Sequence, residues 1–171
     1  SAAIGAGVFS PDSLLISTGT SWVGFFPTED RAAAVEKGLL VDPFMSHKGG
    51  CWGAIFSIPK IGGTVDSLLD KIFKGCNLAP QEKYSRMAEL ASAVHAGSEG
   101  IFIDLSSPPE RLPACTEGAL CRAIMESAAY MLRRMCERYA GHAGAFKRIV
   151  MCGGPSQSRV WTQIVADVTG I

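Results

Sequence analysis

Two glycine-containing turns in this sequence combine small polar side chains with bare backbone, a combination that can hold a negatively charged ligand. The first turn is Thr18-Gly19-Thr20-Ser21. Gly19 would let the backbone come close to a ligand, while the three hydroxyl side chains and the turn amides could bind a phosphate. The alternative is a plain hairpin turn, because glycine and small polar residues favour turns for conformational reasons alone.

The second turn lies near the end of the chain, where an apolar segment from Ile149 to Cys152 runs into Gly153 and Gly154. Without side chains at this point, a flat ring could lie against the backbone. Pro155 and Ser156 would then open a helix, with Ser156 as its N-cap and its positive end facing the same space. The segment matches neither G-x-G-x-x-G nor G-x-x-x-x-G-K-[ST], and a tight turn without a ligand remains the alternative.

Length and charge limit the classes of function. The 171 residues suit a single domain over 1–171, and 16 basic residues balance 16 acidic ones. This balance argues against nucleic acid or an anionic membrane as a partner, so an anionic ligand must be held locally. No apolar run reaches the roughly 18–20 residues of a membrane-spanning helix, and the start SAAIGAGVF lacks the basic region of a signal peptide. We expect a cytoplasmic protein.

The thiol and imidazole side chains do not form a metal-binding pattern. His47, His95 and His142 stand alone, and no C-x-x-C pair is present, so we predict no metal site made of protein ligands. We expect the cysteines to be reduced and to pack as small apolar residues. They are Cys51, Cys76, Cys115, Cys121, Cys136 and Cys152.

Strands are predicted on both sides of the tetrad and before the glycine pair. Leu14 to Ser17 and Trp22 to Phe26 form a hairpin around the tetrad. The irregular residues 39–60 should contain a strand near Ala54 to Ile58. Residues 100–105, GIFIDL, are typical of a buried strand, and Ile149 to Cys152 of a short interior one.

Helices are predicted between these strands by the 3.6-residue spacing of apolar residues. The first starts at Val65, directly after Gly62-Gly63-Thr64, and the second covers residues 81–95. The longest runs from Glu117 to Tyr139 with a core-facing stripe of Met and Leu, and the last ends at Gly170. Alternating strands and helices predict an α/β layered domain, in which ligands bind where strands end and helices begin.

A family pattern runs through four segments: STGTS (17–21), GGTVDSLL (62–69), LCRAIMESAAYMLRRMCE (120–137) and GGPSQSRVWTQIVADVTG (153–170). Together they resemble the carboxy-terminal domain of the FGGY carbohydrate kinases, the group that includes xylulokinase, gluconokinase and glycerol kinase. The closing segment is the most specific of the four. The opening AAIGAGV is also similar to the helix that follows the family's catalytic loop, and SSPPERLP with Glu110 and Arg111 stands where relatives have a loop resembling N/S-G-E-R-T-P.

The resemblance implies an actin-like ATPase (ribonuclease H-like) fold, a mixed sheet with flanking helices. It also implies ATP and Mg²⁺ as cofactors, bound in a cleft between two domains. Thr20 beside Gly19 would contact the terminal phosphates, and Gly62 and Asp66 would lie along the ribose and phosphates. The adenine and its sugar would face Gly154, Pro155 and Ser158. The complete set of nucleotide-binding residues that we predict is Thr18, Gly19, Thr20, Ser21, Gly62, Asp66, Gly153, Gly154, Pro155 and Ser158.

In the family, the general base is an aspartate a few residues before the helix that corresponds to AAIGAG. That aspartate is not among the 171 residues of this sequence. We therefore expect a kinase domain that is truncated at both ends, contains no catalytic residue and is inactive alone. The sugar or polyol, and most Mg²⁺ ligands, would belong to an amino-terminal domain. Loss of that domain would expose Trp22, Phe25, Phe26 or Met45, so a homo-oligomer is expected.

Two other functions remain open at this point. An actin-like binding or scaffolding module would keep the fold without the chemistry, and Thr20 and the glycine pair would then serve shape only. A nucleotide-sugar or methyl-donor enzyme would use the final strand and glycine pair as a Rossmann turn. That enzyme requires an acidic residue about 20 positions further on, past Ile171.

Overall fold

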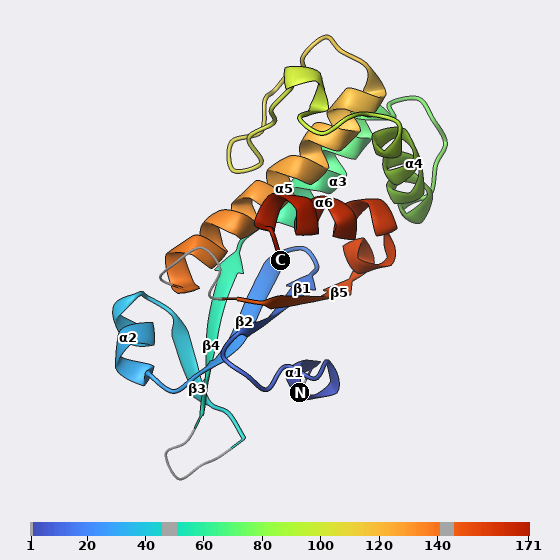
Figure 1. Ribbon diagram of the computed structural model, residues 1–171. Coiled ribbons are helices and arrows are strands. Elements are labelled where there is room, and N and C mark those ends of the chain that lie inside the picture. Colours follow the sequence, from blue (N-terminus) through green and yellow to red (C-terminus); the bar gives the residue numbers. More distant parts are fainter. Residues whose placement is uncertain (1, 46–50, 141–145) are drawn as a thin grey trace.

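The computed structural model describes residues 2–45, 51–140 and 146–171. Within them, a five-stranded mixed sheet has the order β3-β4-β2-β1-β5 (Figure 1). The predicted hairpin is confirmed, because β1 (Ser13–Thr18) pairs antiparallel with β2 (Trp22–Thr28). The predicted strand before the glycine pair is β5 (Arg148–Gly153), which runs parallel to β1. The ends of β1 and β5 therefore lie side by side.

The other edge of the sheet comes from the irregular region. β4 (Trp52–Ile58) confirms the strand expected there and pairs antiparallel with β2, and β3 (Leu40–Pro43) pairs antiparallel with β4. A short helix α2 (Arg31–Glu36) precedes β3, and the Asp30 side chain caps it by accepting a hydrogen bond from Ala33 N. The sequence patterns did not predict α2 or β3, which are too short to carry a clear period.

Four helices gather on one side of the sheet, whereas α1 (Ala2–Gly5) lies apart from them (Figure 1). They are α3 (Ile61–Ile72), α4 (Pro80–Ser92), α5 (Glu117–Ala140) and α6 (Arg159–Thr169). The second, third and last predicted helices are confirmed within a few residues. Gly170 ends α6 in a left-handed conformation, with φ of 75°.

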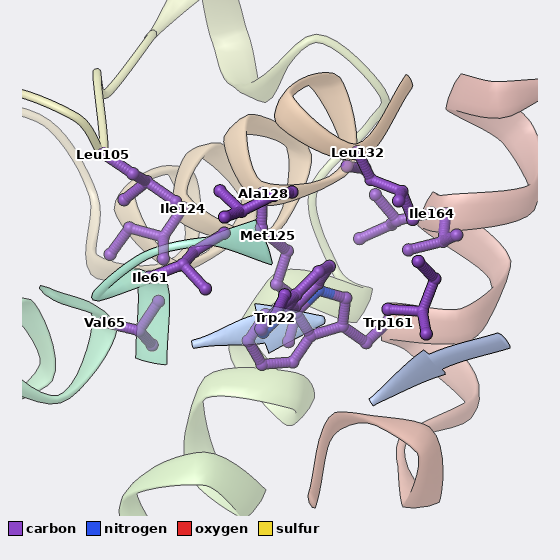
Figure 2. Packing of buried hydrophobic residues seen from close by; sticks show 14 of the residues in the cluster. Trp22, Ile61, Val65, Leu105, Ile124, Met125, Ala128, Leu132, Trp161 and Ile164 are labelled. Atoms are coloured by element: carbon purple, nitrogen blue, oxygen red, sulfur yellow. The ribbon is translucent and has the colours of Figure 1, made fainter. Parts of the chain in front are cut away.

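The main core lies between these helices and the sheet (Figure 2). Ile124, Ala128 and Leu132 of α5 are fully buried, which confirms that the α5 stripe is core. Trp161 of α6 reaches Trp22 of β2, with 6.1 Å between their ring centroids. Burial of each large apolar side chain contributes roughly 1.5–3 kcal/mol, so this layer fixes α5 and α6 to the sheet.

The strand predicted over residues 100–105 is wrong. The chain there forms a 3₁₀ turn, η1 (Ser98–Gly100), followed by residues without regular structure. Ile103 and Leu105 are buried while Phe102 is 66% exposed, so the alternating pattern is real. Alternation records only which side chains face the core, and no strand among the residues that the structure describes pairs with this segment.

A buried carboxylate holds this irregular segment against α5. Glu126 is 4% exposed and accepts hydrogen bonds from Arg122 Nε at 2.8 Å, Gly97 N at 3.0 Å and Ser98 Oγ at 2.9 Å. Gly97, Ser98 and Glu99 all have positive φ angles. The Glu126 contacts offset the cost of that unfavourable backbone conformation.

The expected exposure of apolar residues is mostly wrong. Trp22 and Phe26 are only 2% and 8% exposed, because the helical layer covers them. Phe25 is partly buried and packs edge-on against Phe44, with 4.9 Å between ring centroids. Met45 is 67% exposed, as expected.

The cysteines are free thiols, and burial raises the pKa of Cys121 and Cys136 to about 12. Cys76 is exposed, which differs from the expectation that all six thiols pack inside. His47 and His142 lie outside the described residues. Within the described ranges there is no cluster of three or more His, Cys, Asp or Glu side chains that could hold a metal ion. None of the helices described is both long and apolar enough to span a bilayer.

Replacing Glu126 by Ala should lower the free energy of unfolding by about 3–5 kcal/mol, because its three donors, among them the fully buried Ser98 hydroxyl, lose their acceptor. Urea unfolding measures this change. Glu137→Ala is the matched control: Glu137 also accepts from an arginine at 2.8 Å with i,i+4 spacing, but both side chains are about half exposed. It should cost about 0.5 kcal/mol or less. Equal losses for the two variants would contradict the role given to Glu126.

Candidate functional site

Three bends of the chain touch through their backbones at one end of the sheet. Gly62 N donates a hydrogen bond to Thr20 O at 3.0 Å, which joins the start of α3 to the β1–β2 turn. A Cβ atom on Gly62 would lie 2.3 Å from Gly19 O, and one on Gly153 would lie 2.3 Å from Thr18 O. Neither distance is sterically possible, so both positions require glycine.

This contact corrects the predicted start of α3. The helix begins at Ile61, so Gly62 and Gly63 belong to its first turn rather than to a loop before it. The sequence rule treats paired glycines as a break in a helix. Here the close approach of Gly62 to the β1–β2 turn requires glycine inside the helix.

The hydroxyl groups of the tetrad differ in what they can bind. Thr18 is buried and its Oγ1 donates to Cys152 O at 2.7 Å, which ties β1 to β5. Ser21 Oγ accepts from Lys60 N at 3.2 Å and supports the entry to α3. Thr20 is exposed, and its hydroxyl has no hydrogen-bond partner in the described part of the chain. Thr20 is therefore the hydroxyl that can donate to a ligand.

A cavity of about 580 Å³ opens where the bends meet. This volume lies within the roughly 300–1,000 Å³ that is usual for small-molecule sites. Among the predicted nucleotide-binding residues, the structure places Thr18, Gly19, Thr20, Gly62, Asp66, Gly154, Pro155 and Ser158 on its lining. Ser21 and Gly153 are not on the lining, because they hold the bends together from outside it.

The end of the cavity beside β5 has a bare backbone surface. Gly154 faces open space, since a Cβ added there would meet no atom within 4 Å, and Pro155 follows it. Residues 154–157 form a 3₁₀ turn, η2 (Gly154–Gln157), instead of the first turn of the helix. The N-cap prediction was therefore wrong: Ser156 Oγ donates to Gly153 O, while Ser158 Oγ accepts from Trp161 N and caps α6.

One wall of the cavity comes from α4, which sequence reasoning missed. The residues lie at the i, i+3, i+4 and i+7 spacing of one helix face, next to the buried Met87 and Ala91. That small and polar face was the available signal. It consists of Gln81, Tyr84, Ser85, Ala88, Glu89 and Ser92.

Aromatic rings form the inner surface of the cavity. Trp161 and Trp22 are each 2% exposed, and the Tyr84 ring stacks on Trp161 at 6.3 Å between centroids and 22° between planes. The indole Nε1 of Trp161 is buried without a hydrogen-bond partner among the described residues. Tyr84 also donates its hydroxyl to Asp66 Oδ1 at 2.7 Å. Burial, reinforced by Asp66, raises the pKa of Tyr84, so the hydroxyl keeps its proton at neutral pH.

The arrangement has two chemically different ends. At one end, the Thr20 hydroxyl and the positive end of the α3 dipole favour an anion. At the other, Gly154 and Pro155 offer a flat apolar surface. A ligand with a charged tail and a flat ring suits both ends. Glu110 and Arg111 are not on the lining, and Lys71 holds their loop by donating to Pro109 O and Glu110 O.

Comparison with known proteins gives concordant results. Residues 96–171 match the FGGY family of carbohydrate kinases, C-terminal domain. Autoinducer-2 kinase from Klebsiella pneumoniae subsp. pneumoniae is 33% identical over 110 residues, which cover 53% of this chain and 20% of that protein. This chain therefore spans only a small part of the curated relatives that it matches.

Solved structures agree over nearly the whole chain. Xylulose kinase from Rhodospirillum rubrum has a TM-score of 0.78 at 20% identity, with coverage of 98% of this chain and 35% of that one. Plasmodium falciparum glycerol kinase with ADP has a TM-score of 0.73 at 14% identity, with coverage of 96% and 35%. The fold is thus the expected one, a mixed sheet with flanking helices as in the actin-like ATPase fold.

Gly153 and Gly154 should respond differently to alanine. Gly153→Ala should lower the free energy of unfolding by about 2–4 kcal/mol, because its φ of 102° is unfavourable for alanine and the Cβ would overlap Thr18 O. Gly154→Ala should change it by no more than about 0.5 kcal/mol, since the Cβ enters open space. Urea unfolding of both variants gives the comparison, and similar losses would mean that the two bends do not depend on this contact.

Proposed function

On the basis that this chain belongs to the FGGY family of carbohydrate kinases, we propose the following function. The cavity binds ATP, and the parent protein transfers the terminal phosphoryl group of ATP to a hydroxyl of a sugar or polyol. One observation supports this most: three bends that are far apart in sequence meet around a single cavity, with an anion-binding end and a flat end. The similar glycerol kinase from Plasmodium falciparum was solved with ADP.

The proposed orientation follows from the chemistry of the two ends. The terminal phosphates lie at Thr20 and at the start of α3, where a hydroxyl and the helix dipole favour negative charge. Adenine lies against Gly154 and Pro155, where bare backbone and a proline ring suit a flat heterocycle. The ribose then lies between these ends, within reach of Asp66 on one wall and Ser158 on the other.

Phosphoryl transfer needs the acceptor hydroxyl, the phosphates and Mg²⁺ to be held in line. When bound, Mg²⁺ would neutralise charge on the phosphates, and we expect its ligands mainly in the rest of the parent protein. The sugar and the aspartate base also belong there in this proposal. The residues of this chain bind and orient the nucleotide, so the 171-residue chain alone should bind ATP or ADP weakly and catalyse no transfer. As an ATP-dependent kinase, the protein would act in the cytoplasm.

The nucleotide role of the tetrad predicts a difference between two neighbouring hydroxyls. Thr20→Val, which keeps the side-chain shape, should weaken ADP binding by roughly ten- to a hundredfold through loss of a hydrogen bond to a charged phosphate. Ser21→Ala is the control, because Ser21 supports Lys60 N outside the cavity and its loss should affect stability only. Calorimetric titration of ADP into the purified chain measures both. If ADP shows no saturable binding to the unaltered chain, the fold serves as a non-catalytic scaffold and the nucleotide role is wrong.

The kinase reaction is tested on the full-length protein that carries these residues. With ATP and Mg²⁺, one or more members of a panel of pentoses, hexoses and polyols should stimulate ADP formation, measured by a coupled assay. Thr20→Val in the same protein should lower kcat/KM for ATP by a similar factor to its effect on binding. ADP formation that no sugar or polyol stimulates would contradict the proposed acceptor class.

A further inference from the structure

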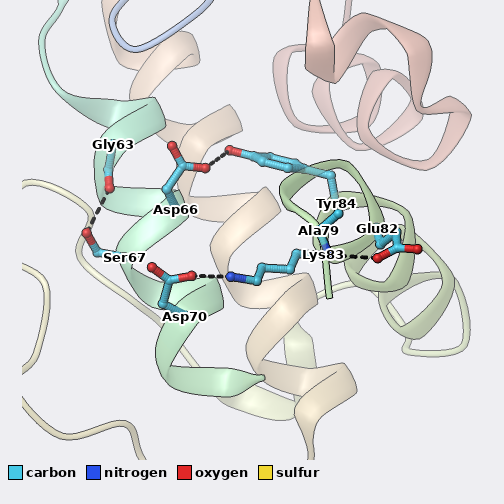
Figure 3. A network of polar contacts seen from close by, with 8 residues as sticks. All are labelled: Gly63, Asp66, Ser67, Asp70, Ala79, Glu82, Lys83 and Tyr84. Atoms are coloured by element: carbon cyan, nitrogen blue, oxygen red, sulfur yellow. Dashed lines mark hydrogen bonds and ion pairs between the residues drawn. The ribbon is translucent and has the colours of Figure 1, made fainter. Parts of the chain in front are cut away.

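Asp66 and Tyr84 meet across the wall of the cavity, one from α3 and the other from α4 (Figure 3). Both residues line the cavity, and the Tyr84 hydroxyl donates to Asp66 Oδ1 at 2.7 Å. The bond uses one carboxylate oxygen and leaves Oδ2 available. Asp66 is exposed toward the cavity side of α3, so a bound ligand can reach this oxygen.

Tyr84 is itself held in place, which gives Asp66 a defined orientation. Its ring stacks on Trp161, a core residue that is 2% exposed and belongs to α6. The raised pKa of Tyr84 keeps its hydroxyl a donor at neutral pH. A flexible aspartate on a helix surface loses side-chain entropy when it binds a ligand. The hydrogen bond from Tyr84 already restricts the Asp66 side chain, so less entropy is lost on binding.

The chemistry of a carboxylate restricts what Asp66 can bind. An ionised carboxylate only accepts hydrogen bonds, so its partner on the ligand must be a donor. Phosphate oxygens near neutral pH carry negative charge and would be repelled. The donors of a nucleotide are the ribose hydroxyls and the amino groups of the base.

The position of Asp66 on α3 decides between these donors. Gly62 and Asp66 are four residues apart on the same helix face, and both line the cavity. One turn of helix rises about 5.4 Å, which is too short to separate a phosphate from a base but suits the neighbouring sugar. The other carboxylate on the cavity lining, Glu89, is on α4 rather than α3. It already accepts a hydrogen bond from Arg86 at 2.8 Å.

We propose that Tyr84 is a positioning residue that holds Asp66 to accept hydrogen bonds from the ribose hydroxyls, so that the site selects ribonucleotides over dideoxynucleotides. This inference rests on the proposed nucleotide site and adds a determinant of specificity to it. Neither a phosphate contact nor a contact to the base gives the same dependence on the sugar hydroxyls.

The chain provides a matched control in a second side-chain link between the same two helices. Lys83 of α4 donates to Asp70 of α3 at 2.5 Å, and Asp70 is 65% exposed (Figure 3). Neither residue lines the cavity. Asp70→Asn therefore weakens a link between α3 and α4 without changing the cavity wall.

The experiment compares calorimetric titrations of ADP and 2′,3′-dideoxy-ADP with the full-length protein. The unaltered protein should bind ADP roughly ten- to a hundredfold more tightly than the dideoxy form, as expected for hydrogen bonds to a charged group. Asp66→Ala should bring this ratio close to one and leave the affinity for dideoxy-ADP nearly unchanged. Tyr84→Phe, which keeps the stacked ring, should reduce the ratio at least threefold. Asp70→Asn should leave it unchanged.

Several results would overturn the inference while leaving the nucleotide site intact. One is ADP binding with the same ratio in Asp66→Ala as in the unaltered protein, and another is an unaltered ratio in Tyr84→Phe. If Asp66→Ala does not fold, Asp66→Leu serves in its place, because it also removes every acceptor from the position. Absence of ADP binding to the unaltered protein would instead contradict the proposed function itself, so the two failures are distinguishable.

Discussion

The site depends on a contact between backbones that permits no side chain. The β1–β2 turn packs directly against the start of α3 and the end of β5, and a Cβ at Gly62 or Gly153 would lie 2.3 Å from a carbonyl oxygen of that turn. Two hydrogen bonds reinforce the contact, one from Gly62 N to Thr20 O and one from Thr18 Oγ1 to Cys152 O. The start of α3 and the end of β5 lie more than forty and more than a hundred residues from this turn in the sequence, yet both are held against it. The cavity lies directly beside this contact.

The same contact divides the glycines and hydroxyls into two groups with different tasks. One group holds the bends together and leaves no side-chain hydroxyl free for a ligand; it consists of Gly62, Gly153, Thr18 and Ser21. Thr20 and Gly154 remain open toward the cavity. Because the aromatic surface of Trp22, Trp161 and Tyr84 continues into the main core, the geometry of the cavity is fixed by the most buried part of the domain. The packing that stabilises the domain therefore also sets the shape of the cavity at this end of the sheet.

Sequence patterns predicted the elements that carry a clear period and the bends that carry glycine. The β1–β2 hairpin, the α5 stripe and the Gly170 cap were predictable, because local alternation, helical spacing and a left-handed cap are properties of neighbouring residues. Residues 100–105 were wrongly predicted as a strand, since alternation does not show whether a partner strand exists. The α4 wall was missed because its small and polar face lines a cavity only once α3 and α6 are packed against α4. The role of Ser158, rather than Ser156, as the α6 cap depends on an intervening 3₁₀ turn that the sequence does not mark.

A crystal structure of this chain with ADP would show whether the three bends form one nucleotide site. We expect the diphosphate beside Thr20 and the first turn of α3, with the adenine ring against Gly154 and Pro155. The distances among the three bends should stay as they are, because backbone contacts already fix them. ADP bound at another surface would contradict a nucleotide site at these bends, and ADP bound here with its ring at Thr20 and its phosphates at Gly154 would contradict the proposed orientation.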